Sequence, residues 1–273
     1  MSFTYHPPVI GIFDSGVGGL TVARAVLREL PAAHLLYLAD TAHVPYGPRP
    51  LLQVRDFAVQ IIGFLYEQGA DAVVMGCNMS SAAGARDAGI KLYGKPLYEV
   101  IRPGAHAAQA ATRNGRVGVI ATQGTVNSGA YERALQAVGV TEVFQQACPA
   151  FVPLVERGLD DGSEVEAVVA EYLTPLRDAG IDTLIFGCTH YPFLSDAIAR
   201  FLGPAVTLID PGTFTAVEVA AQFASTQPPA AADAHRFYSS GDPESLRREG
   251  ARLLGFPLHN VERVGVPVER MLG

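Results

Sequence analysis

Two cysteines in matching surroundings are the residues of this sequence best suited to chemistry. Cys77 lies in the segment GADAVVMGCN (Gly69–Asn78), and Cys188 lies 111 residues later in GIDTLIFGCT (Gly180–Thr189). Two thiols from related segments can act as base and acid on opposite faces of one carbon atom. Inversion of an amino acid at Cα needs this pair, because a single base returns the proton to the side from which it came. The duplication therefore favours inversion over hydrolysis.

Each thiol needs a nearby group that holds or moves its proton. Asp14 can assist Cys77, and His190 and Glu156 can assist Cys188. Each cysteine is expected at the N-terminus of a helix, where free N–H groups and the helix dipole lower the pKa of a thiol. The predicted catalytic residues are therefore Cys77, Cys188, Asp14, His190 and Glu156.

Cysteines also have non-catalytic roles. A cysteine is often only a small buried side chain, and we interpret Cys148 as structural in this sense because it lacks the Gly-Cys setting. Cys188 and His190 form a Cys-x-His pair, but no second paired ligand motif accompanies it. We therefore predict no metal site.

Two common cofactors fit the sequence poorly. The glycines of Gly16–Gly19 suggest a dinucleotide loop, but Thr21 stands where the fingerprint needs a third glycine, and Asp14 would oppose a pyrophosphate. Pyridoxal phosphate needs a Schiff-base lysine, and the only lysines, Lys91 and Lys95, lie in a predicted surface loop. We therefore expect no cofactor.

Short apolar segments alternate with helical patterns along the chain. The predicted strands are Val9–Phe13, Leu35–Leu38, Ala72–Met75, Leu97–Val100, Val117–Ile120, Thr183–Phe186 and Val206–Ile209. The predicted helices are Leu20–Leu30, Leu51–Gln68, Ser80–Ala88, Ala105–Thr112, Ser128–Val138, Val165–Ala179, Asp196–Phe201 and Thr215–Ala224. This alternation is typical of parallel sheets covered by helices, whose ligands bind beyond the carboxyl ends of the strands. The candidate catalytic cysteines and Asp14 follow such strands directly.

A second repeated segment supports an internal duplication. Ile10–Asp14 (IGIFD) resembles Val117–Ala121 (VGVIA), 107 residues later, which is close to the spacing of the two cysteines. Similar spacings indicate two related lobes of about a hundred residues each. We predict an α/β fold with two pseudo-symmetric α/β lobes. Each lobe is a mainly parallel sheet flanked by helices, and the active site lies in the cleft between them.

Composition narrows the range of partners. The chain has 273 residues, of which 49% are hydrophobic and 17% charged, which suits a globular protein of one or two domains. A net charge of −7 without a cluster of Lys and Arg disfavours nucleic acid. We find neither a signal peptide nor an apolar stretch of membrane-spanning length, so we expect a cytoplasmic protein without a membrane partner. An odd number of cysteines, three, predicts free thiols.

Several blocks of residues resemble bacterial glutamate racemases, of the aspartate/glutamate racemase family. They occur in order along nearly the whole chain: IGIFDSGVGGLTV (Ile10–Val22), YLADTAHVPYG (Tyr37–Gly47), GCNMSSA (Gly76–Ala82), PLVERG (Pro153–Gly158), GCTHYPFL (Gly187–Leu194) and FYSSGDPESL (Phe237–Leu246). The resemblance implies an enzyme that converts L-glutamate to D-glutamate for peptidoglycan synthesis, without metal or cofactor, and that forms a homodimer. It also implies a first lobe of residues 1–101 plus 211–273 and a second lobe of residues 102–210.

The resemblance assigns roles to individual positions. Cys77 and Cys188 match the two thiols, Asp14 the carboxylate that assists the first, and Glu156 and His190 the pair that assists the second. The residues implied in substrate binding are Asp14, Ser15, Tyr46, Gly47, Asn78, Met79, Thr122, Thr125, Thr189 and His190. One position departs from the family, because Met79 stands where a threonine is usual. A hydroxyl donor is thereby lost from the expected carboxylate site, which leaves the choice between glutamate and aspartate open.

Three alternative functions remain open at this point. Aspartate racemisation would use the same two thiols with a shorter side-chain pocket. Acyl transfer with Cys188 as nucleophile and His190 as base would leave Cys77 without a role. A non-catalytic two-lobed protein that closes on an amino acid would need none of the reactive groups.

Overall fold

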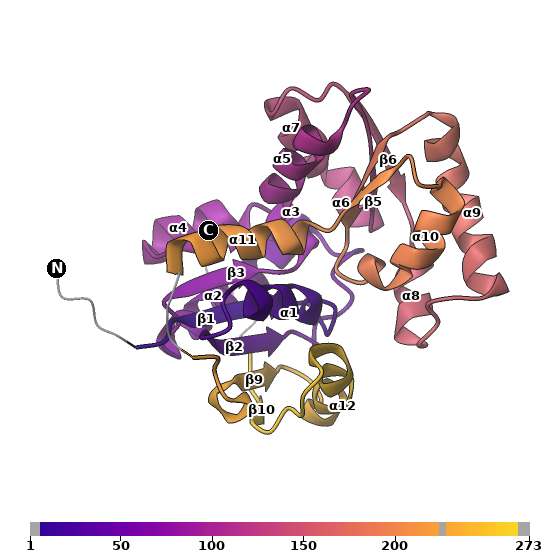
Figure 1. Ribbon diagram of the computed structural model, residues 1–273. Helices are drawn as coiled ribbons and strands as arrows, with labels where there is room; N and C mark the ends of the chain where they lie inside the picture. The colour runs from indigo at the N-terminus through magenta and orange to yellow at the C-terminus, as the bar shows by residue number, and fades with distance from the viewer. Residues whose placement is uncertain (1–5, 224–227, 267–273) are drawn as a thin grey trace.

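Two parallel sheets organise the chain (Figure 1). The computed structural model describes residues 6–223 and 228–266, so Ala224, at the end of the predicted helix Thr215–Ala224, lies outside the described residues. The strands are β1 (Val9–Asp14), β2 (His34–Ala39), β3 (Ala72–Met75), β4 (Leu97–Glu99), β5 (Arg116–Ala121), β6 (Glu142–Ala147), β7 (Thr183–Gly187), β8 (Thr207–Ile209), β9 (Arg236–Ser239) and β10 (Val261–Arg263).

The strand order repeats between the two sheets. The first sheet has the order β10-β9-β2-β1-β3-β4 and the second β6-β5-β7-β8, and all neighbouring strands are parallel. The order β2-β1-β3-β4 therefore recurs as β6-β5-β7-β8. The repeated segments of the sequence form β1 and β5, and β3 and β7. The predicted α/β fold with two related lobes is confirmed.

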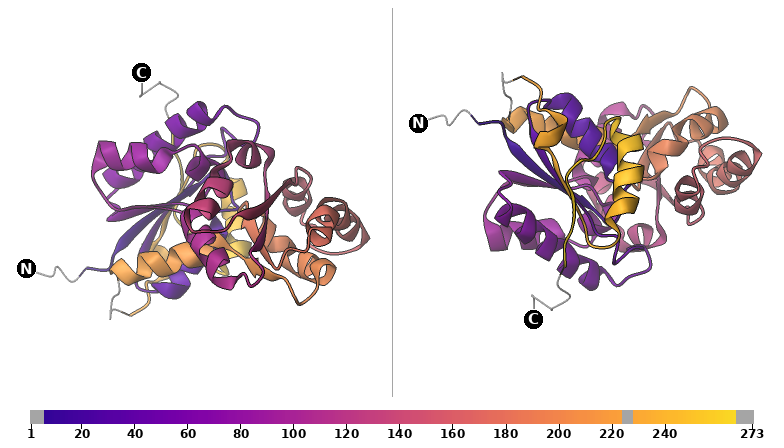
Figure 2. Two further views of the ribbon diagram at one scale, coloured as in Figure 1. Left: turned by 90° about the horizontal axis from the view of Figure 1, so that it is seen from above. Right: turned by 90° about the horizontal axis from the view of Figure 1, so that it is seen from below.

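Helices cover both faces of each sheet (Figures 1 and 2). They are α1 (Leu20–Glu29), α2 (Leu51–Glu67), α3 (Asn78–Ala82), α4 (Ala85–Tyr93), α5 (Ile101–Ala111), α6 (Gln123–Ser128), α7 (Ala130–Ala137), α8 (Phe151–Glu156), α9 (Ser163–Asp178), α10 (Ser195–Leu202), α11 (Pro211–Phe223) and α12 (Pro243–Leu254), with 3-10 helices η1 (Tyr191–Leu194) and η2 (Ala232–Ala234). One face of the first sheet packs against α1, α11 and α12, and the other against α2 and α4. The second sheet lies between α5 and α7 on one face and α8, α9 and α10 on the other.

The alternating direction of side chains along each strand explains why helices cover both faces of each sheet. Ile10 and Ile12 of β1 pack with α1, whereas Phe13 points to the opposite face and packs with α2. In β5, Val117 and Val119 face α5 and α7, and Ile120 faces the other side. Successive side chains of a strand point to opposite faces, so strands that are apolar throughout need cover on both faces.

The start of α5 was predicted wrongly. We expected the helix from Ala105, but it begins at Ile101 and includes Pro103. The carboxylate of Glu99 accepts hydrogen bonds from the N–H groups of Ile101, at 2.6 Å, and Arg102, at 2.9 Å. This carboxylate satisfies the first N–H groups of the helix, and a proline is tolerated in a first turn because its missing N–H has no partner there.

Two predicted helices are each interrupted by a glycine. The expected helix Ser80–Ala88 is divided between α3 and α4 at Gly84, which has φ of +71°. The expected helix Ser128–Val138 is α7, separated from α6 by Gly129 with φ of +63°. Glycine adopts this left-handed conformation without steric cost, so it ends one helix and starts the next in another direction.

Apart from the 3-10 helices, six elements of the described residues were not predicted: β6, β9, β10, α6, α8 and α12. β6 is a partly exposed edge strand of the sequence EVFQQA, without the continuous apolar pattern of the central strands. The sequence does contain a signal for α12, because Asp242 precedes Pro243 and an amphipathic segment. In the structure, the carboxylate of Asp242 accepts the N–H of Glu244 at 3.1 Å. In the part of the chain that the structure describes, no helix is both long and apolar enough to cross a membrane.

Candidate active site

A cavity of about 780 Å³ lies between the carboxyl ends of the strands of the two sheets. All thirteen residues that the sequence singled out line it: Asp14, Ser15, Tyr46, Gly47, Cys77, Asn78, Met79, Thr122, Thr125, Glu156, Cys188, Thr189 and His190. Cys148, which we interpreted as structural, is fully buried yet also belongs to the cavity wall. The structure thus brings together residues that are up to 176 positions apart in the sequence.

Cys77 stands between the end of β3 and the start of α3. Burial raises the pKa of its thiol to about 12, and the negative charge of Asp14 acts in the same direction. The backbone N–H and the hydroxyl of Ser80, together with the backbone N–H of Met79, lower the pKa, as expected for a cysteine before a helix. Their effect is smaller than that of burial, so the pKa of Cys77 is raised, and the expectation of a lowered pKa is wrong.

Asp14, at the end of β1, connects the two lobes. Its Oδ1 accepts the N–H of Ser15 at 2.8 Å, and its Oδ2 accepts the hydroxyl of Thr189 at 2.9 Å. The side chain is 1% exposed. Because Thr189 directly follows Cys188, this hydrogen bond fixes the second cysteine's segment relative to the first lobe.

A glycine permits this approach. A Cβ atom at Gly18 would lie 2.5 Å from Thr189 Oγ1 and 2.7 Å from His190 Nδ1, which no side chain tolerates. Gly18, in the loop that resembles part of a dinucleotide motif, therefore allows close contact between the lobes.

Cys188, His190 and Glu156 form a connected series at the second lobe. Cys188 Sγ lies 3.9 Å from His190 Nδ1, and His190 Nε2 lies 3.8 Å from Glu156 Oε1. Burial raises the pKa of the Cys188 thiol well above its ordinary value; the N–H of His190 lowers it, and the charges of Asp14 and Cys77 raise it. The two thiols are thus close enough for the charge of one to act on the other.

The polar residues that the resemblance implies in substrate binding come from both lobes. Asn78 accepts a hydrogen bond through Oδ1 from the hydroxyl of Tyr131, on α7, at 2.6 Å. The hydroxyls of Thr122 and Thr125 lie 3.1 Å apart. Since Oδ1 of Asn78 is occupied, its amide N–H₂ remains as a donor. Sequence reasoning missed Tyr131, which is fully buried and whose position beside Asn78 only the fold creates.

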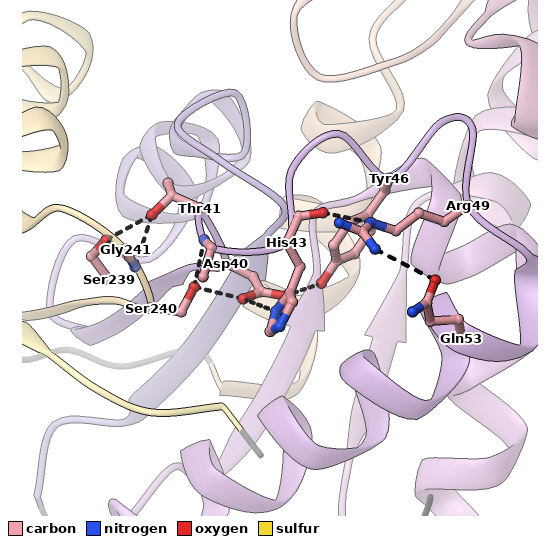
Figure 3. Close-up of polar contacts among 10 residues, drawn as sticks. Asp40, Thr41, His43, Tyr46, Arg49, Gln53, Ser239, Ser240 and Gly241 are labelled. Carbon is pink, nitrogen blue, oxygen red and sulfur yellow. Dashed lines mark hydrogen bonds and ion pairs between the residues drawn. The ribbon is translucent and has the colours of Figure 1, made fainter. Parts of the chain in front are cut away.

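Met79 and Tyr46, which belong to the same set, offer no side-chain hydrogen-bond donor to the cavity. Met79 is buried against the second lobe, since a Cβ at Gly124 would lie 2.9 Å from its sulfur. The hydroxyl of Tyr46 donates to Asp40 Oδ2 at 2.5 Å (Figure 3), so its proton is not available to a ligand. Tyr46 therefore contributes to the cavity through its ring and the adjoining backbone.

Metal ligation has no support among the described residues. Within 6–223 and 228–266, no three side chains of His, Cys, Asp or Glu are grouped so that they could hold a metal ion. A second cavity of about 470 Å³ lies against α4, α5 and α11, and its wall contains no cysteine. The cavity between the sheets is accordingly the candidate active site, and its chemistry is that of two thiols, a histidine and two carboxylates.

Comparison with known proteins gives concordant results. The family model described as Asp/Glu/Hydantoin racemase matches residues 10–219. A glutamate racemase of Beutenbergia cavernae is 47% identical over 90% of this chain and 89% of its own. Among solved structures, glutamate racemase RacE1 of Bacillus anthracis superposes with a TM-score of 0.89 at 38% identity, covering 96% of this chain and 99% of its own. Glutamate racemase of Francisella tularensis in complex with D-glutamate gives 0.86 at 32% identity, with the same coverage.

Proposed function

Because the chain belongs to the Asp/Glu/hydantoin racemase family, we propose that it interconverts L- and D-glutamate by a two-thiol mechanism without a cofactor. The observation that carries the proposal is that Cys77 and Cys188 line one cavity from two different sheets. The names of similar proteins, among them a racemase bound to D-glutamate, support glutamate as the substrate.

The proposed reaction is a transfer of one proton in and one proton out. One cysteine, as a thiolate, removes the proton from Cα, and the bonding electron pair stays on the substrate as a carbanion delocalised into the α-carboxylate. The thiol on the opposite face then donates its proton to Cα. The first sulfur ends protonated and the second as a thiolate, so the reverse reaction begins with the roles exchanged.

Generating the thiolate is the step that the raised pKa values make difficult. The substrate's ammonium group brings a positive charge into the cavity, and a nearby positive charge favours the thiolate. At Cys188, His190 Nδ1 can accept the proton, and Glu156 stabilises the resulting imidazolium. At Cys77, the neighbouring carboxylate of Asp14 is the group that can accept it. Asp14, His190 and Glu156 thus serve as the proton partners of the two sulfurs.

Substrate binding is assigned to groups from both lobes. The residues proposed to hold the ammonium and carboxylates, through side chains or backbone, are Asp14, whose carboxylate accepts, and Ser15, Tyr46, Gly47, Asn78, Thr122, Thr125, Thr189 and His190, with Met79 beside them. Their supply by both lobes supports a substrate held between the lobes, with Cα between the sulfurs.

We also propose the organisation implied by the resemblance. The lobes are residues 1–101 plus 211–273 and residues 102–210; the membership of strands β1–β4, β9 and β10 in one sheet and β5–β8 in the other supports this division. The protein would act as a homodimer in the cytoplasm and supply D-glutamate for peptidoglycan. Multi-angle light scattering tests the dimer, and D-glutamate rescue of a deletion strain tests the role.

Circular dichroism of L-glutamate and L-aspartate, incubated separately with the protein, tests the reaction and its substrate. We expect the optical activity of glutamate to decay to zero and that of aspartate to persist. Decay of aspartate alone would assign the enzyme to aspartate. Neither decaying, with a trapped acyl-thioester at Cys188, would indicate acyl transfer instead.

A further inference from the structure

A buried carboxylate outside the catalytic set lies behind the cavity wall. Asp40 directly follows β2 and is fully buried. It accepts hydrogen bonds from His43 Nδ1 at 2.9 Å, from the hydroxyl of Ser240 at 2.6 Å and from the hydroxyl of Tyr46 at 2.5 Å (Figure 3). A carboxylate that is removed from water is stable only with such donors, so this group imposes positions on its three partners.

The segment from residue 41 to residue 50 depends on these contacts. It has no helix or strand and contains three prolines, yet residues 44–50 form a continuous part of the cavity wall. Arg49 Nε donates to the carbonyl of His43 at 2.7 Å, and the ring of His43 stacks on Phe57 with centroids 4.2 Å apart. Phe57 also contacts the ring of Tyr46, at 5.9 Å. Asp40, which directly follows β2, therefore connects both His43 and Tyr46 to the sheet through hydrogen bonds.

Gly47 is where this segment reaches the second lobe. A Cβ at Gly124 would lie 2.3 Å from the carbonyl oxygen of Gly47, and a Cβ at Gly47 would lie 3.5 Å from the Cβ of Thr122. The residue next to Tyr46 thus sets the distance between the lobes at the cavity. A displacement of the Tyr46 ring would be transmitted to this contact through one peptide bond.

We propose that Asp40 is a positioning residue for substrate binding, acting through the hydroxyl of Tyr46 to hold Gly47 at the cavity wall. This inference rests on the proposed function, because it takes the cavity as the substrate site. Asp40 does not line the cavity, so it does not touch the reacting atoms. Its effect should therefore appear in substrate binding more than in proton transfer.

Tyr46→Phe and Asp40→Asn test the proposal while keeping side-chain volume. We expect each to raise the KM for glutamate by about ten-fold, the size of one lost hydrogen bond to a charged group, with kcat changed less than about two-fold. The double variant should match the stronger single variant, because Tyr46→Phe removes the donor of the same contact whose acceptor loses its charge in Asp40→Asn. Additive increases in log KM, or loss of kcat with KM unchanged, would overturn the proposal.

Thr41→Val is the matched control. Its hydroxyl pairs with that of Ser239 at 2.9 Å, on the same side of the network, without contacting Tyr46 (Figure 3). KM should stay at the wild-type value in this variant even if the melting temperature falls. A rise in KM equal to that of Tyr46→Phe would show general loosening of the fold and overturn the specific role of Asp40.

Amide hydrogen exchange separates this inference from the proposed function. The N–H of Arg49 donates to the carbonyl of Tyr46 at 3.0 Å and reports on the segment without any substrate. Its exchange should accelerate about ten-fold in Tyr46→Phe and Asp40→Asn, but not in Thr41→Val. If the exchange rates follow this pattern but the wild-type protein does not racemise glutamate, the proposed function is refuted and the positioning role of Asp40 is retained. Unchanged exchange would overturn the inference itself.

Discussion

At the scale of residues, two opposing influences act on each proposed catalytic thiol. The N–H groups that follow Cys77 and Cys188 lower the thiol pKa, whereas burial in the cavity wall raises it more strongly. Burial therefore favours the neutral form of both thiols. In the proposed reaction, the positive charge of the substrate's ammonium would favour the thiolate.

The raised pKa of Cys77 predicts a pH dependence of stability. Burial favours the protonated, neutral thiol. The fold is therefore more stable when Cys77 is protonated than when it is a thiolate. This contribution is fully present below the pKa of an unfolded cysteine, about 8.5, and is lost as the pH rises to about 12, the pKa of Cys77 in the fold. Urea unfolding over this range should show a steeper loss of unfolding free energy for the wild type than for Cys77→Ser. Equal slopes would contradict the raised pKa.

Replacing one cysteine at a time should separate the two faces of the reaction. Cys77→Ser should lower racemisation at least about 100-fold, because one of the two proton-transfer groups is lost. The remaining Cys188 should still exchange Cα–H for deuterium in one enantiomer, and Cys188→Ser should show the mirror pattern. Nuclear magnetic resonance of L- and D-glutamate in D₂O measures this exchange. Equal loss of exchange for both enantiomers would contradict one base per face.

Tyr131 is expected to act through Asn78. Tyr131→Phe removes the donor to Asn78 Oδ1, so the amide is free to rotate and its N–H₂ is no longer held ready for a substrate carboxylate. We expect KM for glutamate to rise about ten-fold with little change in kcat. In an Asn78→Ala background the same substitution should have almost no effect on KM. Independent effects of the two changes would contradict this coupling.

At the scale of elements, the C-terminal segment supports the site from outside it. β9 extends the first sheet beside β2, and Ser240, just after β9, contacts Asp40. α12 lies beside α1 (Figure 2), and its apolar residues pack on α1 and the same side of that sheet. None of these elements lines the cavity. Their contribution is to the stability of the sheet edge that carries the segment from residue 41 to residue 50.

Removing the N-cap of α12 should therefore affect stability and not binding. Asp242→Ala takes away the carboxylate that accepts the N–H of Glu244, which should cost about 1 kcal/mol of unfolding free energy. Chemical denaturation measures the loss. KM for glutamate below the melting temperature should remain at the wild-type value, and an increase in KM would show that α12 also positions the site.

At the scale of the molecule, the proposed active site exists only where the lobes meet. Two hydrogen bonds cross between them at the cavity, from Thr189 to Asp14 and from Tyr131 to Asn78. Each joins the residue that directly follows one of the cysteines to the opposite lobe: Thr189 follows Cys188, and Asn78 follows Cys77. The separation of the two thiols is thus set by contacts between lobes and not by either lobe alone.

Gly18→Ala should disturb this separation. Its methyl group would occupy the space of Thr189 Oγ1 and the His190 ring, so the segment that carries Cys188 must move away from the first lobe. We expect kcat/KM to fall at least about 100-fold, since small displacements of reacting groups are costly. Gly16→Ala is the control, because a Cβ there meets no atom within 4 Å. Activity of the Gly18 variant equal to that of the control would contradict the close approach.

The sequence alone predicted the architecture and singled out the candidate reactive residues. The apolar strands required helices on both faces, and the repeat around Cys77 and Cys188 implied two related halves, because these properties follow from local patterns and chain order. It did not reveal edge strand β6, whose polar pattern is set by partial exposure, nor the breaks at Gly84 and Gly129.

Only the tertiary structure decided how the residues act on each other. It placed Tyr131 beside Asn78, turned the hydroxyl of Tyr46 toward Asp40, and buried both thiols enough to raise their pKa values. Such contacts join residues from different elements, and desolvation depends on every atom that surrounds a group. Neither is encoded in the spacing of residues along one segment, so both become defined only when the two lobes pack together.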